Sequence, residues 1–184
     1  MSRKNNQGFT LIELMVVVAV VAIIATVAIP GLQAFVASNR QAGAVNDFLA
    51  SLYFARDEAV TRNSSITICP SNDGAGCDAV GWEQGHIVFV DDDADGALDA
   101  GEDTLSTMEP LPAGLTLRSA QFVDFLIYRP NGRVRVADPN VNQGRFTICA
   151  AGAGEQARVA DIGFSGRPFA RRLTGDAAVA VCGG

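Results

Sequence analysis

One uninterrupted apolar segment constrains this chain more than any other feature of its sequence. From Phe9 to Ile29 there are 21 residues, and Glu13 is the only ionisable one among them. As an α-helix the segment would be about 32 Å long, enough to cross a bilayer core of about 30 Å. A carboxylate inside such a helix costs about 3 kcal/mol near the membrane centre and less near an end. The sequence therefore predicts a membrane-spanning helix in which something compensates the charge of Glu13.

The residues around this segment favour one orientation and weaken two simple explanations. Arg3 and Lys4 precede it, so the positive-inside rule keeps the N-terminus in the cytoplasm and everything after residue 30 outside it. A cleaved secretory signal would need a small-x-small cleavage site, but the alanines from Ala19 to Ala28 are always three apart. A plain membrane anchor explains the length of the segment and leaves Glu13 unexplained.

The residues KNNQGFTLIELMVV resemble the N-terminal signal of type IV pilins and type II secretion pseudopilins. The resemblance implies a prepilin leader peptide, residues 1–8. Prepilin peptidase would cut between Gly8 and Phe9 and N-methylate Phe9. Residues 9–30 would then be a transmembrane and assembly helix that crosses the bacterial inner membrane once. The resemblance also implies that Glu13, the fifth mature residue, neutralises the Phe9 amine of a neighbouring subunit, because two charges that are costly alone in lipid become tolerable together.

After Pro30 and Gly31, which predict a kink rather than an end of the helix, the pattern becomes amphipathic. Apolar residues recur at spacings of three, four and seven up to about Arg62, which is typical of a helix with one face against a domain. We therefore expect residues 31–62 to continue the helix into a globular domain. These apolar positions are Leu32, Phe35, Val36, Val45, Leu49, Leu52, Tyr53 and Val60.

Residues 63–184 are expected to form a β-rich domain on the periplasmic side. Short strand-like runs are separated by turn signals such as Asn131-Gly132 and Gly152–Gly154, and the pattern predicts no second helix of convincing length. The expected fold class is α+β and type IV pilin-like, with a long N-terminal helix packed on an antiparallel β-sheet. The expected strands are SITIC (65–69), GHIVFV (85–90), DTLSTME (103–109), GLTLRS (114–119), FVDFLIYRP (122–130), GRVRVA (132–137), GRFTICA (144–150), ARVADIGFS (157–165) and AVAVC (178–182).

Four cysteines, all beyond the apolar segment, indicate disulfides in an oxidising compartment. A zinc site is disfavoured because no CxxC occurs and His86 is the only histidine. A local bridge between Cys69 and Cys77 would clamp one turn, and Cys149 and Cys182 end two runs that could lie side by side. Four cysteines allow three pairings, and the sequence leaves all three open.

Three further stretches extend the resemblance over nearly the whole chain: FARDEAVTRNSSITICPSNDGAGC, GWEQGHIVFVDDDADG and FSGR. Together they are similar to the GspH/FimT family of minor pilins and pseudopilins. Cysteine-bearing members with the Ala-Val-Thr-Arg segment look more like the FimT/FimU pilus branch. The resemblance implies a structural subunit that packs with other pilins and primes pilus assembly. The alternative is a GspH-like minor pseudopilin of a type II secretion system, which packs with other pseudopilins in a pseudopilus.

The segment DDDADGALDAGE, residues 91–102, fits the spacing of a calcium-binding loop, D-x-D-x-D-G-x5-E. An EF-hand is flanked by two helices, whereas the preceding GHIVFV reads as a strand. The alternative is therefore an acidic, solvated hairpin loop in which Asp and Gly serve the turn. The expected calcium ligands are Asp91, Asp93, Asp95, Ala97 through its carbonyl oxygen, Asp99 through water, and Glu102.

Charge is unevenly distributed along the chain, whose formal net charge is −6. Residues 73–109 hold eleven acids and no Lys or Arg, whereas residues 110–184 hold nine Arg and five acids. Arginine suits phosphate because it is always charged and can contact two oxygens. A DNA-binding receptor pilin for natural transformation is therefore a further alternative function. The candidate DNA contacts are Arg133, Arg135, Arg167, Arg171 and Arg172.

The family resemblance supports these arginines only in part. Some FimT-type pilins carry a Gly-Arg-x-Arg motif near the C-terminus that contacts DNA during uptake. Gly132–Arg135 matches that string but lies earlier in the chain, and Gly166-Arg167 is followed by Pro-Phe, which breaks it. The alternative is a solvated strand face or a contact with another subunit.

Enzymatic patterns are missing from the sequence. His86 lies in a strand pattern, and Ser165 in GFSGR lacks the second glycine of a nucleophile elbow. The only lysine, Lys4, lies in the leader, and no phosphate-binding loop of the G-x-x-x-x-G-K type occurs. We therefore expect no catalytic activity.

Overall fold

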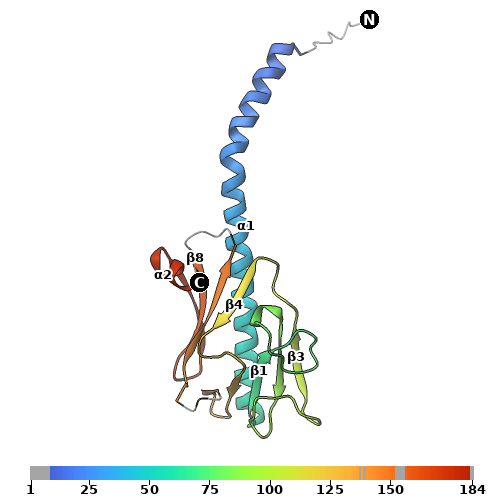
Figure 1. Cartoon of the computed structure of the whole chain (residues 1–184), viewed down its shortest axis with the longest axis vertical. Coiled ribbons are helices and arrows are strands. Elements are labelled where there is room, and N and C mark those ends of the chain that lie inside the picture. Colours follow the sequence, from blue (N-terminus) through green and yellow to red (C-terminus); the bar gives the residue numbers. More distant parts are fainter. Residues whose placement is uncertain (1–8, 137, 139, 152–155, 183–184) are drawn as a thin grey trace, which may run out of the picture.

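A computed structural model describes residues 9–136, 138, 140–151 and 156–182 of the chain. The expected leader, residues 1–8, and the expected turn at Gly152–Gly154 lie outside the described residues. Figure 1 shows a long helix whose lower part lies along a β-rich domain and whose upper part projects from it.

The helix α1 runs without a break from Leu11 to Arg62. It begins at Thr10, whose hydroxyl oxygen accepts a hydrogen bond from the backbone N–H of Glu13 at 3.3 Å and so caps the first turn. It ends at Asn63, which adopts the left-handed conformation with φ 55°. The helix continues through residues 30 and 31, and its upper part curves away from the domain (Figure 1).

Within the described residues, the strands form two antiparallel sheets. The first sheet has the order β3-β2-β1-β5-β6, and the second has the order β4-β7-β8-β9. The short helix η1 (Trp82–Gln84) precedes β2, and α2 (Asp176–Cys182) follows β9. The strands are β1 (Ile66–Pro70), β2 (His86–Val90), β3 (Thr104–Met108), β4 (Leu115–Ser119), β5 (Leu126–Tyr128), β6 (Val134–Arg135), β7 (Gly144–Ala150), β8 (Gln156–Ile162) and β9 (Pro168–Thr174).

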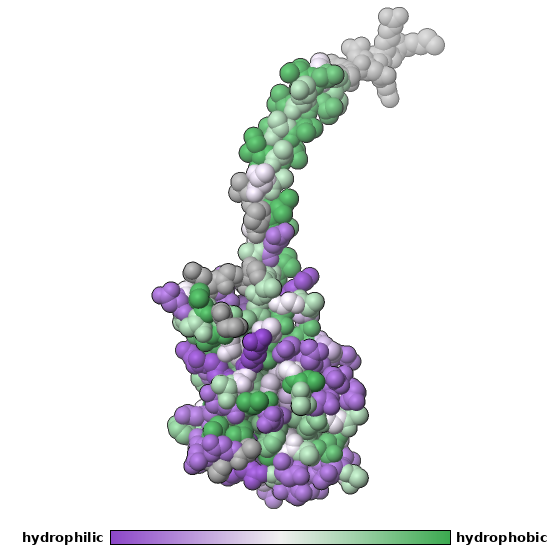
Figure 2. Space-filling model, viewed as in Figure 1, coloured by the Kyte–Doolittle hydropathy of each residue, from purple (hydrophilic) through white to green (hydrophobic). Residues whose placement is uncertain are grey.

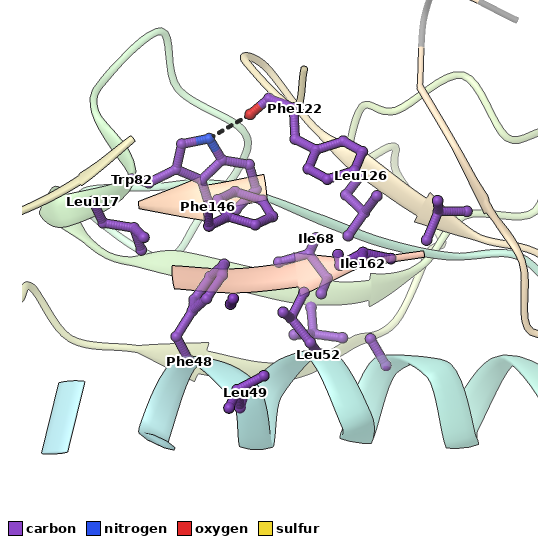
Figure 3. Close-up of a cluster of buried hydrophobic side chains, with 14 of the residues drawn as sticks. Phe48, Leu49, Leu52, Ile68, Trp82, Leu117, Phe122, Leu126, Phe146 and Ile162 are labelled. Atoms are coloured by element: carbon purple, nitrogen blue, oxygen red, sulfur yellow. Dashed lines mark hydrogen bonds between the residues drawn. The ribbon is translucent and has the colours of Figure 1, made fainter. Parts of the chain in front are cut away.

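The hydrophobic core lies where the lower part of α1 meets both sheets. Phe48 of α1 is central: its ring centroid lies 6.0 Å from that of Trp82 and 4.6 Å from that of Phe146 in β7. The indole N–H of Trp82 donates a hydrogen bond to the carbonyl oxygen of Phe122 at 2.8 Å (Figure 3). Each large apolar side chain buried in this way contributes about 1.5–3 kcal/mol to stability. Figure 3 also labels Leu49, Leu52, Ile68, Leu117, Leu126 and Ile162 in this cluster.

The expected fold class is confirmed, since a long N-terminal helix packs on antiparallel sheets in an α+β architecture. The domain contains two sheets, however, where a single sheet was expected. The run ARVADIGFS is also shorter as a strand than predicted. Strand β8 ends at Ile162, and a turn follows in which the Gly166 N–H donates to the Gly163 carbonyl oxygen at 2.8 Å.

The C-terminal segment differs most from the sequence interpretation. The predicted strand AVAVC (178–182) is the last part of helix α2. Alanine has the highest helix propensity, and a short run of small apolar residues does not separate strand from helix by periodicity. The sequence interpretation also missed β9, because most side chains of this edge strand are exposed and it therefore lacks an apolar alternation.

Candidate functional site

The upper part of α1, residues 11–36, is the most exposed apolar surface among the described residues. Its large apolar side chains, where the structure describes them, are exposed, from 77% for Leu11 to 39% for Val36. By length and composition α1 could cross a membrane. Figure 2 shows this part as a mostly green stalk above a domain with many purple groups. A soluble monomer rarely exposes so large an apolar surface, so lipid or other subunits must cover it.

The two residues expected to act in assembly lie at the start of α1, four positions apart in the sequence. Phe9 precedes the cap residue Thr10 and is 87% exposed. Glu13 lies in the first turn, where the helix macrodipole favours a negative charge. Its carboxylate makes no hydrogen bond or ion pair with any residue that the structure describes. Gly8 and the scissile bond lie outside those residues, so the proposed cut stays a prediction.

The four cysteines form two disulfides, Cys69–Cys77 and Cys149–Cys182. This is one of the three pairings that the sequence left open. The first bridge closes the turn after β1. The second joins the outer face of β7 to the end of α2, and so holds α2 against the second sheet.

The acidic loop, residues 91–103, joins β2 to β3 and covers part of the outer face of the first sheet. Leu98 of the loop packs against a small buried cluster that contains Cys69, Ile87 and Phe89. Gly96 adopts φ +88°, and a Cβ atom there would lie 2.5 Å from the ring of Phe125. The loop therefore has a packing role that its composition did not indicate.

Three of the expected calcium ligands come together in this loop. One carboxylate oxygen from each of Asp91, Asp93 and Asp95 lies within 4.8 Å of the others. Asp91 is fully buried, and it accepts hydrogen bonds from the Thr67 hydroxyl and, at 3.1 Å, from the Gly96 N–H. Burial raises the pKa of Asp91, although these hydrogen bonds act against the rise. Its carboxylate thus already anchors the loop to β1.

The remaining expected ligands take part in hydrogen bonds within the loop itself. The two oxygens of Glu102 accept hydrogen bonds from the backbone N–H groups of Asp92 and Asp99, each at 2.9 Å. The Ala97 N–H donates to the Asp95 carboxylate at 2.8 Å. These contacts are those of a self-stabilised acidic hairpin loop. They favour that alternative, and calcium binding stays an untested prediction.

The five candidate DNA contacts do not form one surface. Arg171 is bound by the carboxylate of Asp161, whereas Arg172, its neighbour in β9, points to the other face and donates to Gln156 and Ser38. Arg135 donates to the carbonyl oxygen of Ala94 in the acidic loop. The arginines of β6 and β9 therefore have separate structural partners.

Arg133 and Arg167 are exposed, and their backbones are close together. A Cβ atom at Gly166 would lie 1.9 Å from the carbonyl oxygen of Gly132 and 3.0 Å from the Cα of Arg133. Both glycines have φ +73°. The two Gly-Arg pairs thus meet where the turn after β5 touches the turn after β8.

Sequence reasoning did not single out Asp161, which forms ion pairs with two arginines. Its carboxylate binds the guanidinium groups of Arg145 in β7 and Arg171 in β9. Partial burial favours the neutral acid, but these hydrogen bonds outweigh it and hold the pKa of Asp161 below its usual value. One sequence signal was available: in GRFTIC, Arg145 and Thr147 are two residues apart and so share one strand face.

His86 is a core residue rather than a catalytic base. It is 5% exposed, and its ring lies edge-on to Phe48 with centroids 5.3 Å apart. Burial lowers its pKa to about 4, so the imidazole is neutral at pH 7. Ser165 is exposed in the turn between β8 and β9, and no described histidine other than His86 exists to activate it.

Comparison with solved structures gives two groups of similar proteins. One is the type IV minor pilin FimU of Pseudomonas aeruginosa, in two crystal forms. Both are 25% identical to this chain, with TM-scores of 0.55 and 0.56, covering 78% and 74% of this chain and 94% and 98% of FimU. The other is the minor pseudopilin EpsH of Vibrio cholerae, 13% identical, with a TM-score of 0.47, covering 73% of this chain and 97% of EpsH.

Comparison with protein-family profiles gives two matches, one at the N-terminus and one over the globular domain. The prokaryotic N-terminal methylation motif matches residues 3–29. A search of curated proteins found no significant match. The profile described as "Type II transport protein GspH" matches residues 44–166, which is 123 of 184 residues. Pilins and pseudopilins of this kind are structural proteins and not enzymes. Because the match covers more than half of the chain, this protein belongs to the GspH family, as the sequence resemblance predicted.

Proposed function

We propose that this pilin or pseudopilin is a minor pilin that primes assembly of a type IV pilus. The observation that carries the proposal is the similarity to FimU, which extends over 94% of the FimU chain at 25% identity. The alternative, a minor pseudopilin of a type II secretion system, is supported by the family description. Both alternatives share the same processing and the same assembly helix.

In this proposal prepilin peptidase removes residues 1–8 and methylates the amine of Phe9. Residues 9–30 then hold the subunit in the inner membrane, and residues 31–62 connect them to a periplasmic domain, residues 63–184. The methylation motif at residues 3–29 supports this division. Mass spectrometry of the membrane-bound protein should show loss of residues 1–8 and one added methyl group on Phe9. An intact leader, or a cut near residue 30, would contradict it.

Assembly depends on the carboxylate of Glu13 in this proposal. Cutting before Phe9 creates a cationic amine at the membrane surface, and the Glu13 carboxylate has no partner in the described part of its own chain. An amine from a neighbouring subunit would supply the opposite charge. In lipid such a pair is tolerated far better than either charge alone.

The substitution Glu13→Ala separates assembly from membrane insertion. It makes the apolar segment more apolar, so the protein should stay in the membrane fraction. Its amount in sheared filaments should fall by about tenfold or more, because the charge pair is lost; a tenfold fall corresponds to about 1.4 kcal/mol of assembly free energy. Glu109→Ala is the matched control, since it removes an exposed carboxylate from the domain. Equal filament incorporation of Glu13→Ala and the control would refute the proposed amine–carboxylate pairing.

A deletion strain distinguishes the pilus from the secretion alternative. Surface pili counted by electron microscopy should fall in number, whereas the activity of secreted enzymes in the medium should not change. Loss of secretion with normal pili would reassign the protein to the secretion machine. Co-purification of the cross-linked protein would then identify its neighbours in either filament.

DNA binding is a second candidate function, favoured by the contact between Gly132 and Gly166. This contact brings the exposed Arg133 and Arg167 to adjoining turns, although the chain departs from the family motif after Arg167. Phosphate contacts should give weak binding that falls steeply with salt, with each lost contact lowering the log–log slope by about 0.7–0.9. Titration of duplex DNA into the wild type and Arg133→Gln/Arg167→Gln protein tests this. Equal binding by both would exclude these turns as the contact.

A further inference from the structure

We propose that the outer face of the second sheet is a docking groove for an extended acidic segment of a partner protein. This arginine groove has a volume of about 780 Å³ and lies across β4, β7, β8 and β9, beside α2. Its charged lining residues are Arg118, Arg145, Arg171 and Asp161. The proposed site is separate from the assembly helix and from the turns that carry Arg133 and Arg167.

Strand register explains why these side chains gather. Arg145 lies opposite Asp161 on the neighbouring strand, and Arg118 lies opposite Thr147, two residues along from Arg145. Residues two apart on a strand share one face, so Arg118, Arg145 and Asp161 all project from the same side of the sheet. Arg171 pairs in register with Val159, two residues from Asp161, and therefore projects there too.

The charges in the groove are only partly compensated. Asp161 is 9% exposed and binds both Arg145 and Arg171, so three arginines and one carboxylate leave a net charge of about +2. Arg118 is exposed, and its guanidinium has no hydrogen bond or ion pair within the part of the chain that the structure covers. Arg118 is therefore the guanidinium that is free to bind a ligand.

The groove suits carboxylates on a polypeptide better than a nucleic acid backbone. A guanidinium matches the two oxygens of one carboxylate. Asp161 repels carboxylates and phosphates alike, so the preference for a peptide rests on the apolar part of the lining. The half-exposed ring of Phe169 and the side chain of Val181 also line the groove, which gives apolar contact area for a peptide. A cavity of this volume is within the range of about 300–1,000 Å³ seen for bound ligands, so it admits a short chain segment and not a domain.

In this chain the acidic loop is a hairpin anchored through the buried Asp91, so its sequence, and not its folded conformation, serves as the probe of an extended acidic segment. The loop, residues 91–103, forms none of the ion pairs present between described residues. A groove on one molecule and an acidic segment on another make a heterologous contact, the type that continues along a filament rather than closing a dimer. The proposal holds for a pilus and for a secretion machine alike.

Fluorescence anisotropy with the full-length protein in detergent micelles tests the groove. The probe is a labelled peptide with the sequence of residues 91–103, titrated at low salt and at about 0.15 M salt. We expect saturable binding that weakens with salt. Arg118→Glu should reduce the affinity by about tenfold or more and Arg118→Gln by less, because only the former places a like charge against the peptide. Arg129→Glu, the matched control at an exposed arginine outside the groove, should change the affinity less than about twofold.

Three results would overturn the proposal. The first is the absence of saturable peptide binding at low salt. The second is an equal loss with Arg118→Glu and Arg129→Glu, which would mean that only net charge matters. The third is tighter binding of a duplex DNA that Arg118→Glu abolishes, which would assign the groove to nucleic acid. An unchanged melting temperature of both variants confirms that a loss of binding reflects the groove and not unfolding.

Discussion

The two halves of α1 belong to one continuous helix but have opposite surroundings. In the upper half, residues 11–36, large apolar side chains point outward on all sides, and Glu13 is the only charge. In the lower half, residues 41–62, one face is buried against the sheets, and the exposed side carries polar and charged side chains together with Phe54 and Val60. The same secondary structure is therefore stabilised in two different ways.

The two halves of the helix are therefore stabilised by different surroundings: the lower half by the chain's own core, and the upper half by lipid or neighbouring subunits. The lower half gains its stability from apolar surface that it buries within the chain itself, as Phe48 and Leu52 do. The upper half buries nothing within the described structure, so lipid and neighbouring subunits must provide its surroundings. Substitutions in the two halves should therefore affect different measurements.

The largest expected effect is the loss of Phe48 from the core. Phe48→Ala should lower the free energy of unfolding by about 3–5 kcal/mol, because it removes a buried ring and leaves a cavity. Denaturant unfolding of the full-length protein in micelles can follow the fluorescence of Trp82, the only tryptophan, which lies beside Phe48. Val20→Ala, in the exposed half, should leave that transition unchanged. A similar loss for both variants would mean that the upper half also packs on the domain.

The two disulfides should contribute unequally to the domain. In the chain-entropy model the bridge between Cys149 and Cys182, 33 residues apart, is worth about 3.5–4 kcal/mol, and the bridge between Cys69 and Cys77, 8 residues apart, about 2.5 kcal/mol. Replacing each pair by alanine and comparing free energies of unfolding checks the order. Neither change should release the protein from the membrane fraction. Equal losses would indicate that loop length does not govern their contribution.

Acid should weaken the domain through His86. Its pKa is about 4 in the folded protein against an ordinary value of 6.5, so the unfolded chain binds the proton more readily. The part of the free energy of unfolding that depends on neutral His86 is therefore complete above pH 6.5. It is lost as the pH falls towards 4, by about 3 kcal/mol at most. Unfolding measured from pH 7 to pH 5 should show a slope that His86→Phe removes.

Two carboxylates with shifted pKa values also affect how stability changes with pH in that experiment. The raised pKa of Asp91 opposes the loss of stability at acid pH, and the lowered pKa of Asp161 adds to it only below the range used. An unchanged slope in His86→Phe would assign the acid sensitivity to carboxylates instead of the buried imidazole.

Calcium should have the smallest effect. Asp91 and Glu102 already satisfy backbone and side-chain donors in the loop, so millimolar calcium should leave the melting temperature of the full-length protein unchanged. A chelator provides the matched control. A rise in melting temperature that Asp93→Ala abolishes would show that the calcium-loop spacing of the sequence has functional meaning.

The sequence predicted the helix well because its signals are local. A charge-free run, an amphipathic repeat up to Arg62 and the turn at Asn63 each depend on neighbouring residues, and α1 ends where the repeat ends. The buried face was predicted only in part: Val45, Leu49 and Leu52 are buried. The other apolar positions expected on that face are exposed, namely Leu32, Phe35, Val36, Tyr53 and Val60. The family followed from the motif around Glu13 and from three further stretches of the chain, and the fold class followed from one long helical pattern that precedes a series of short strand patterns.

The arginine groove could not be predicted, because it depends on long-range pairing. Arg118, Arg145 and Arg171 lie on three strands, and only the register of the second sheet aligns them around Asp161. The edge strand β9 has no alternation of apolar and polar residues from which a strand could be predicted. For the same reason the five arginines predicted to contact DNA do not lie on one surface, since residues adjacent in sequence, such as Arg171 and Arg172, face opposite sides of a strand.

The unbroken course of α1 through residues 30 and 31 fixes an angular relation between the membrane and the domain. Each helical residue turns the chain by about 100°, so the side of the helix on which Glu13 lies is set relative to the face that Phe48 buries. A single residue inserted near position 36 would keep both halves helical yet rotate the Glu13 carboxylate by about a quarter of a circle or more around the axis. The helix therefore fixes the orientation of the domain around the helix axis as well as its distance from the membrane. A subunit whose Glu13 carboxylate docks on a neighbour thereby also determines which side of its domain faces outward.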